Sequence, residues 1–373
     1  MNRGSKRNRL IDRYLGIPAL AFLRFFGQRK RAMPSQVRRI GVMCAPAIGD
    51  TLLLAATLRD LKAAFPSAEV WFFATPLNRS AAELLPAVDE LVVVPMPAAW
   101  KAVRALRRSS LDILVDFSPW IRASALLARL SGARLSIGFR TAGQHRHWCY
   151  DRSVELSDRV HQIENYARLG EAIGVGARSQ LTLRDDLESP VGAPETGRTV
   201  VFHAFAIGSL QALREWPAER WVSLARHLDR AGTTFILTGS PADAPRVEDL
   251  QDQLMAAGLQ CRGLVGRFGL REIVPILKSA SLVVSVNTGI MHLAAILGAP
   301  TVGINGPTAD HRWGPRGPLA VSVAKKEGCG FLNLGFEFDG NPTDCMARIS
   351  VDDVLSAIRT LQQIGDKQLA AYS

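Results

Sequence analysis

The chain has 373 residues, enough for two or three domains, and 47% of them are hydrophobic, so sizeable cores can be buried. Its net charge is +11, but residues 1–39 hold eleven basic side chains against one acidic one, so the remainder carries only +1. Charge confined to one terminus, without a recognition module, argues against a nucleic-acid-binding protein.

The five cysteines lack the spacing of a metal site or a redox motif. They form no C-x-x-C pair and no zinc-ligand pattern. We therefore expect reduced thiols in a cytosolic protein, and the sequence leaves a Cys329–Cys345 bridge open as the alternative. The cysteines are Cys44, Cys149, Cys261, Cys329 and Cys345.

The basic N-terminal extension, residues 1–37, contains an apolar run, Tyr14–Phe26. The run is too short for a membrane span of ~20 residues, and Gly16, Pro18 and Arg24 interrupt it. A signal peptide also fits poorly, because charged residues precede the run and no small-residue cleavage site follows.

Two interpretations of this extension remain. We expect an element that lies on an anionic membrane surface, with its cations at the headgroups and its apolar side chains in the lipid boundary. The alternative is a helix packed on the protein body with a solvated basic tail. The apolar side chains in question are Leu20, Phe22, Leu23, Phe25 and Phe26.

Residues 38–183 alternate short apolar segments with longer amphipathic ones, which is typical of βαβ units in a parallel sheet. Strands are predicted at 38–45, 68–75, 90–95 and 112–118, with helices at 50–65, near 79–86 and near 98–109. Further helical and loop material is expected up to about residue 183. Residues 184–197 are polar, rich in Pro and Gly and without periodicity, so they are predicted to be a linker.

The alternation then starts again in residues 198–350. Strands are predicted at 198–206, 233–240, 282–286 and 300–305, with helices at 217–231, 243–257, 270–280 and 289–297. Residues 351–373 form a closing helix and tail, which Ser350 and Asp353 open with a capping box. The predicted fold class is α/β, with two Rossmann-like, doubly wound domains facing a cleft. Ligands in such sheets bind beyond the carboxyl ends of the strands.

Several common motifs are missing. The chain has no G-x-G-x-x-G, no G-x-x-x-x-G-K-[ST], no G-x-S-x-G and no H-E-x-x-H. Their absence weakens the nicotinamide, P-loop, hydrolase and zinc-protease interpretations. What remains is a set of loops with polar residues at the ends of predicted strands.

The first loop follows the first predicted strand and carries Asp50. The preceding Gly49 leaves room for a ligand to approach the backbone. A carboxylate at this place can act as the general base on an acceptor hydroxyl, or it can merely cap the helix that follows.

The second loop lies before the helix predicted to start at residue 217. Ser209 and Arg214 are candidate donor-binding residues, and the Arg214 guanidinium can pair with phosphate. Trp216 and Trp221 are interpreted as packing residues. His203, at the end of a strand, is either a structural histidine or a ligand contact.

The third loop joins the strand at 282–286 to a helix. Thr288 and Gly289 precede the free N–H groups of a helix N-terminus, which suit a diphosphate. His292 follows one turn later, and Asn287 stands where it can cap the helix or bind the ligand.

Taken together and in this order, these stretches resemble glycosyltransferase family 9, the lipopolysaccharide heptosyltransferase family. The resemblance spans residues 38 to about 360. It is carried by RRIGVMCAPAIGDTLLLAATLRDLKAAFP, REWPAERW, VNTGIMHLAAILGAPTVGINGP, HRWGP and ISVDDVL.

The resemblance implies a GT-B fold, with the acceptor in the N-terminal domain and a nucleotide-sugar in the C-terminal one. It implies inverting transfer without a metal or other cofactor, usually from ADP-heptose to a lipid-linked saccharide. It places the catalytic carboxylate at Asp50, the phosphate cation at Arg214, and the diphosphate at Thr288, Gly289 and His292. It also implies a cytoplasmic enzyme on the inner face of the inner membrane.

The chain departs from the family pattern at Asn287, where relatives usually have Asp. Asn caps a helix about as well as Asp, so we expect Asn287 to cap the helix. Asn lacks the charge and the acceptor-only character of Asp, so the identity of the donor sugar stays open. On the acceptor side, the candidates are Arg122, Arg140 in an IGFR turn, Arg146 and His161, with a solvated basic loop as the alternative.

Three other functions stay open at this point. A family member with a different nucleotide-sugar donor would keep the fold and the mechanism. A catalytically weak, membrane-docked GT-B partner protein would have lost transfer. A GT-B nucleotide-sugar epimerase would act on free donor and would need no acceptor-binding cations.

Overall fold

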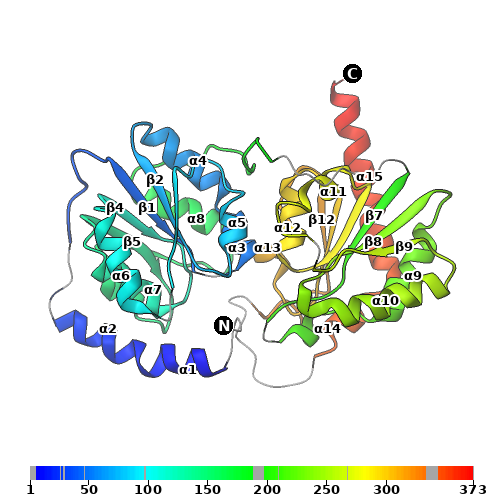
Figure 1. Cartoon of the computed structure of the whole chain (residues 1–373), viewed down its shortest axis with the longest axis horizontal. Helices are drawn as coiled ribbons and strands as arrows, with labels where there is room; N and C mark the ends of the chain where they lie inside the picture. The colour runs from blue at the N-terminus through cyan, green and yellow to red at the C-terminus, as the bar shows by residue number, and fades with distance from the viewer. Residues whose placement is uncertain are drawn as a thin grey trace. The chain divides into compact units, whose positions relative to one another are not determined.

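The computed structural model describes residues 6–25, 27, 30–45, 47–95, 98–187, 197–208, 210–266, 268–332 and 343–372, with backbone alone at 6–9 and 368–372. The described residues form two compact units, which meet in the chain at Asp185 and Asp186 (Figure 1). Most of the predicted linker, residues 188–196, lies outside the described residues.

The N-terminal unit is built on one six-stranded parallel sheet of order β3-β2-β1-β4-β5-β6. Its strands are β1 (Arg39–Met43), β2 (Glu69–Ala74), β3 (Glu90–Val93), β4 (Ile113–Asp116), β5 (Leu135–Arg140) and β6 (Arg152–Glu155). Its helices are α1 (Lys6–Tyr14), α2 (Gly16–Phe25), α3 (Ile48–Leu52), α4 (Ala55–Ala64), α5 (Arg79–Ala82), α6 (Ala99–Arg108), α7 (Arg122–Leu130), η1 (Arg146–Cys149) and α8 (Gln162–Glu171).

The C-terminal unit repeats this plan with a six-stranded parallel sheet of order β12-β11-β10-β7-β8-β9. Its strands are β7 (Arg198–His203), β8 (Thr233–Leu237), β9 (Cys261–Gly263), β10 (Leu282–Val286), β11 (Thr301–Asn305) and β12 (Ala320–Ala324). Its helices are η2 (Gln211–Arg214), α9 (Ala218–Leu228), η3 (Pro241–Asp243), α10 (Ala244–Ala256), α11 (Val274–Ser279), α12 (Gly289–Ile296), α13 (Asp310–Trp313), α14 (Cys345–Arg348) and α15 (Val351–Tyr372).

The strands form where the sequence has short runs of β-branched and other apolar residues. The central strands β4 and β10 are buried along their whole length, as expected for parallel strands covered by helices on both faces. The prediction of two parallel α/β domains is therefore confirmed. The predicted capping box is present too, because Ser350 N donates to Asp353 Oδ2 at 2.7 Å and Asp353 N to Ser350 Oγ at 3.1 Å.

The predicted helix at 50–65 is two helices, α3 and α4, separated at Leu53 and Leu54. Four further strands, β5, β6, β9 and β12, were not predicted from the sequence. The segment predicted as the IGFR turn lies inside β5. A glycine within a strand resembles a turn signal, but a side chain at Gly138 would overlap the Tyr150 ring, so glycine is needed there for packing.

The N-terminal helices pack on the N-terminal unit. Helix α2 contacts α7 and η1, and Figure 1 shows α1 and α2 running beside α7. Leu20 is fully buried in the core of this unit, and Leu23 packs against the same core. The expectation that Leu20 enters lipid is wrong, because the protein's own core covers this side chain.

The opposite side of the same helices is exposed. Phe22 is 63% exposed and Phe25 92% exposed, whereas Phe26 lies outside the described residues. Leu10, Ile11, Tyr14 and Leu15 are exposed as well. None of the helices in the described ranges is both long and apolar enough to cross a bilayer.

Two of the five cysteines are bonded. A disulfide joins Cys329 and Cys345, whose Cα atoms lie 5.7 Å apart, so the expectation of reduced thiols is wrong for this pair. Cys44, Cys149 and Cys261 are free thiols. Burial raises the pKa of Cys149 and of Cys261 to about 12, which makes both poor nucleophiles.

Candidate active site

Both sheets reverse their strand order at one place, and the candidate residues follow the strands on either side of it. In the N-terminal unit the reversal lies between β1 and β4, and Asp50 follows β1. In the C-terminal unit it lies between β7 and β10, with Arg214 after β7 and Asn287 after β10. Such switch points are the usual ligand sites of open α/β sheets.

Asp50 is the third residue of α3, which begins after Ala47. Because Ala47 occupies the N-cap position and makes no side-chain cap, the alternative that Asp50 is the helix N-cap is wrong. The carboxylate is largely buried, with 8% of the residue exposed. Burial, and next the Asp50 charge, raise the pKa of the neighbouring Cys44 thiol well above its ordinary value.

Asn78 fixes the loop that carries Asp50, a role that was not predicted from the sequence. Its Nδ2 donates to Cys44 O at 2.9 Å and to Thr51 Oγ1 at 2.8 Å, and Thr51 Oγ1 donates to Ala47 O at 3.0 Å. Asn78 is fully buried after β2, the strand next to β1. The signal available in the sequence was a polar residue shortly after the strand predicted at 68–75, because a polar residue that becomes buried there needs hydrogen-bond partners.

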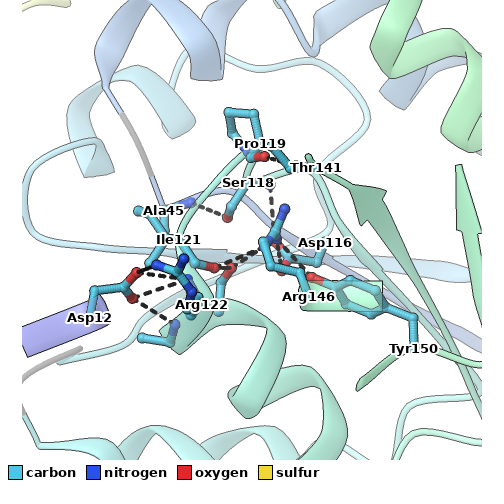
Figure 2. Close-up of polar contacts among 12 residues, drawn as sticks. Asp12, Ala45, Asp116, Ser118, Pro119, Ile121, Arg122, Thr141, Arg146 and Tyr150 are labelled. Carbon is cyan, nitrogen blue, oxygen red and sulfur yellow. Dashed lines mark hydrogen bonds and ion pairs between the residues drawn. The ribbon is translucent and has the colours of Figure 1, made fainter. Parts of the chain in front are cut away.

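The loop after β4 is held by a buried polar network, shown in Figure 2. Arg146 Nη2 donates to Asp116 Oδ2 at 2.8 Å, and Tyr150 Oη donates to the same oxygen at 2.6 Å. Burial raises the pKa of Tyr150 well above its ordinary value, so its hydroxyl keeps the proton that it donates. Asp116 Oδ1 accepts from Ser118 N at 2.9 Å, and Ser118 Oγ accepts from Ala45 N at 3.0 Å.

This network corrects the acceptor assignment of Arg146. The side chain is fully buried and is paired with Asp116, so it is a structural cation rather than one presented to an acceptor. Arg122 is also buried and is paired with Asp12 at 3.1 Å. His161 is the N-cap of α8 and is 2% exposed. Among the four acceptor candidates, Arg140 at the end of β5 is the exposed one.

In the C-terminal unit, Arg214 ends the short helix η2, on the loop after β7. Its Nη2 donates to Ile207 O at 2.7 Å, and the residue is partly exposed. The next residue, Glu215, accepts from Ala206 N at 2.9 Å and from Arg246 at 2.8 Å, which braces this loop against α10. Ser209 lies outside the described residues.

The two tryptophans of this region are packing residues, as the sequence predicts. Trp216 and Trp221 are buried with their rings edge to face, and Trp216 Nε1 donates to Ile349 O at 2.8 Å. His203 is structural as well, because it is 4% exposed and its Nδ1 lies 2.8 Å from Thr238 Oγ1.

Asn287 does not cap α12, contrary to our expectation. The N-cap position belongs to Thr288, which makes no side-chain cap, and Asn287 instead joins three segments. Its Nδ2 donates to Asn305 Oδ1 at the end of β11 and, at 2.8 Å, to Trp313 O in α13. Asn305 in turn donates to Ser322 Oγ, in the middle of β12, at 2.8 Å, so an amide ladder links the ends of β10 and β11 to β12.

The remaining donor candidates lie at the start of α12. Thr288 has extended backbone, Gly289 is the first helical residue, and both are partly exposed. His292 is 3% exposed, one turn into the helix. Within the described part of the chain, no group of three His, Cys, Asp or Glu side chains is placed to hold a metal ion.

Replacing His203 tests its buried, neutral state. Burial lowers the pKa of His203 to about 4, while the pKa is about 6.5 in the unfolded chain. The unfolded chain therefore binds this proton first, and the free energy of unfolding falls as the pH drops from about 6.5 to about 4. The loss from this group is about 3 kcal/mol at most.

Urea unfolding at pH 7 and pH 4.5 should show a weaker pH dependence of the free energy of unfolding for His203→Gln than for the exposed control His227→Gln. Equal slopes would count against this role.

The variant Asn287→Asp tests the amide ladder. A carboxylate has no N–H to donate, so it faces Asn305 Oδ1 and Trp313 O with acceptors alone. We expect a loss of about 1–3 kcal/mol in the free energy of unfolding at neutral pH. The control Gln363→Glu makes the same chemical change at an exposed site of α15. If thermal melting shows both variants to be equally stable, Asn287 is no structural link.

The sequence and the fold are similar to those of known proteins. The sequence profile of glycosyltransferase family 9 (heptosyltransferase) matches residues 99–331. Lipopolysaccharide heptosyltransferase 1 of Escherichia coli strain K12 is 25% identical over 289 residues, which cover 72% of this chain and 88% of that protein.

Solved structures show the same fold. A family 9 glycosyltransferase from Veillonella parvula superimposes with a TM-score of 0.71 at 21% identity, over 89% of this chain and 99% of that one. The E. coli heptosyltransferase WaaC with ADP-2-deoxy-2-fluoro heptose gives a TM-score of 0.66 at 20% identity, over 86% and 99%. The chain therefore belongs to glycosyltransferase family 9, the heptosyltransferases, and is a glycosyltransferase with the GT-B fold.

Proposed function

We propose that this enzyme transfers a heptosyl group from ADP-heptose to a hydroxyl of the lipopolysaccharide core or a related glycolipid, with inversion. The observation that carries the proposal is the placement of the polar residues at the two switch points. Asp50 follows β1 in one unit, and Arg214 and Asn287–Gly289 follow β7 and β10 in the other. The choice of donor is supported by the ADP-heptose analogue bound to a relative with the same fold.

The proposed reaction is a single displacement. The acceptor oxygen attacks the anomeric carbon and forms the new C–O bond, while the hydroxyl proton passes to the Asp50 carboxylate. The bond between the anomeric carbon and the β-phosphate oxygen breaks, and its electron pair leaves with ADP. Asp50 is thus the general base, and its loop is held in place by Asn78 before substrate arrives.

Negative charge grows on the leaving diphosphate, and the C-terminal unit offers two groups to stabilise it. These are the Arg214 guanidinium and the backbone N–H groups that start α12 at Thr288 and Gly289. In this proposal these groups take the place of a metal ion, so transfer should persist in EDTA. His292 lies in the same first turn, and it is buried.

A second candidate function is transfer from a different nucleotide-sugar, and Asn287 favours it. Its amide donors are taken by Asn305 and Trp313, so only its carbonyl oxygen is left to accept from a ligand hydroxyl. An Asp at this position would offer two acceptors and a charge. A donor with a different hydroxyl pattern would suit the changed side chain.

On the acceptor side, the proposal keeps Arg140 as the cation that meets acidic sugars or phosphates, since it is exposed at the end of β5. We further propose that α1 and α2 rest on an anionic membrane at the cytoplasmic face. Phe22 and Phe25 are exposed on a segment rich in arginine and lysine, which suits a surface of lipid headgroups.

Donor choice and base catalysis can be tested together. ADP-heptose should raise the melting temperature more than ADP, and both more than UDP, GDP or CDP. Asp50→Asn should leave the ADP-heptose affinity unchanged and slow transfer by about 10²–10⁴-fold, because the proton acceptor is lost. The control Glu83→Gln, at a partly exposed residue, should transfer at the wild-type rate. Full activity in Asp50→Asn would remove Asp50 from the mechanism, and a shift with another nucleotide would change the donor.

Membrane contact can be tested with vesicles. The double variant Phe22→Ser, Phe25→Ser should bind phosphatidylglycerol vesicles at least about tenfold more weakly, because each buried Phe contributes about 1.5–3 kcal/mol. The control Met255→Ser removes an exposed apolar side chain from α10. Equal vesicle binding by all three proteins would return the basic extension to the solvated-tail interpretation.

A further inference from the structure

Helix α7 has no cap of its own. Its N-cap position is Ile121, which carries no side-chain acceptor, and its first turn has no acidic residue. The cap comes instead from Asp12 in α1, 110 residues away in the sequence. Asp12 Oδ1 accepts from Arg122 N at 3.0 Å and from Ala123 N at 3.1 Å. A carboxylate at this position satisfies free N–H groups and complements the helix dipole.

The same carboxylate pairs with the Arg122 side chain. Asp12 Oδ2 lies 3.1 Å from Arg122 Nη1, and both side chains are largely buried. Arg122 Nη2 reaches on to Gly143 O at 3.2 Å, in the loop after β5. At Gly16, where α2 begins, a Cβ would lie 3.0 Å from two atoms of the Arg122 side chain, so α2 is packed tightly against this arginine.

Two further contacts anchor the segment after α2 to the far end of α7. Arg129 Nη2 donates to Gly27 O at 3.1 Å, and Arg31 Nη1 donates to Arg134 O at 3.3 Å. The Arg24 guanidinium also lies 4.8 Å from the centre of the Trp148 ring. The N-terminal helices are therefore held along the whole of α7, with Asp12 at the end nearest the strand ends.

Residues 117–121 form the loop before α7, the helix that Asp12 caps. The other contacts of this loop lead to the loop of Asp50. Arg146 Nε donates to Ile121 O at 3.0 Å and holds Asp116 at the start of the loop. Asp116 fixes Ser118, and Ser118 fixes Ala45 at the start of the segment that carries Asp50. Figure 2 shows these contacts as one connected set, from Asp12 to Ala45.

We propose that Asp12 is a positioning residue for the transfer reaction. In this proposal the N-terminal helices α1 and α2 help to hold the loops of the N-terminal unit that face the acceptor. The inference rests on the proposed function, because it assigns the 117–121 loop and the Asp50 loop to the acceptor side. Loss of Asp12 leaves two helix N–H groups and the buried Arg122 charge without their partner. The start of α7 and the loop before it then lose the order that aligns the acceptor with Asp50.

The test compares Asp12→Ala and Asp12→Asn with Glu83→Ala in the full-length protein. Glu83→Ala removes a carboxylate from an exposed ion pair on α5 that has no contact with the loop. Three readouts are measured: the Kd for ADP-heptose by calorimetry, kcat/KM for the glycolipid acceptor, and hydrogen exchange of the amides of residues 117–123.

For Asp12→Ala we expect kcat/KM for the acceptor to fall about tenfold or more, with the donor Kd within about twofold of wild type. Amide exchange should accelerate at 117–123. Asp12→Asn should lie between this variant and wild type, because its amide oxygen still caps α7 but carries no charge for Arg122. Glu83→Ala should match wild type in all three readouts.

The proposal is overturned if acceptor kcat/KM in Asp12→Ala stays within about twofold of Glu83→Ala, or if donor affinity falls in parallel with transfer. If Asp12→Ala does not fold, the same criteria apply to Asp12→Asn. Absence of transfer in the wild type would count against the proposed function alone. In that case hydrogen exchange decides: unchanged exchange at 117–123 overturns the role of Asp12, and faster exchange supports it.

Discussion

The ion pair between Arg146 and Asp116 is the contact on which the N-terminal unit depends most. Both side chains are fully excluded from solvent, and their nearest atoms are 2.8 Å apart. A buried charge is tolerated only when it is paired and hydrogen-bonded, and Asp116 meets this condition with Arg146, Tyr150 and Ser118. Removing one partner of such a pair typically costs about 3–5 kcal/mol.

This pair also explains how the two sides of the switch point are joined. Asp116 ends β4, and the loop of Asp50 follows β1, its neighbour in the sheet. Ser118 links them with a hydrogen bond to Ala45, while Asn78 holds the Asp50 loop from β2. In the proposed reaction Asp50 accepts a proton, and these two buried polar residues hold the segment that carries it through Ala45, Cys44 and Thr51.

In the C-terminal unit, neighbouring strands are linked near their ends by neutral groups instead of an ion pair. Asn287 and Asn305, at the ends of β10 and β11, are connected to Ser322 in the middle of β12 through amide and hydroxyl hydrogen bonds. In the proposed reaction the positive end of α12 and Arg214 stabilise the leaving diphosphate. The two units therefore share a topology but use different polar chemistry at the equivalent edge.

Sequence alone determined the parallel α/β class, the two halves and the strand ends at which Asp50, Arg214 and Asn287 lie. Those features follow from local hydrophobic periodicity and from motif order, which neighbouring residues encode.

The tertiary structure decided what the polar residues contact. Arg146 and Arg122 look like exposed cations in sequence, yet they are buried because their partners, Asp116 and Asp12, come from distant segments. His161 is buried as well, as the N-cap of α8. The same holds for Asn287, whose partners lie 18 and 26 residues away, and for Leu20, which packs into a core formed by the sheet and α7. Burial and pairing are properties of the folded chain, so no local pattern can specify them.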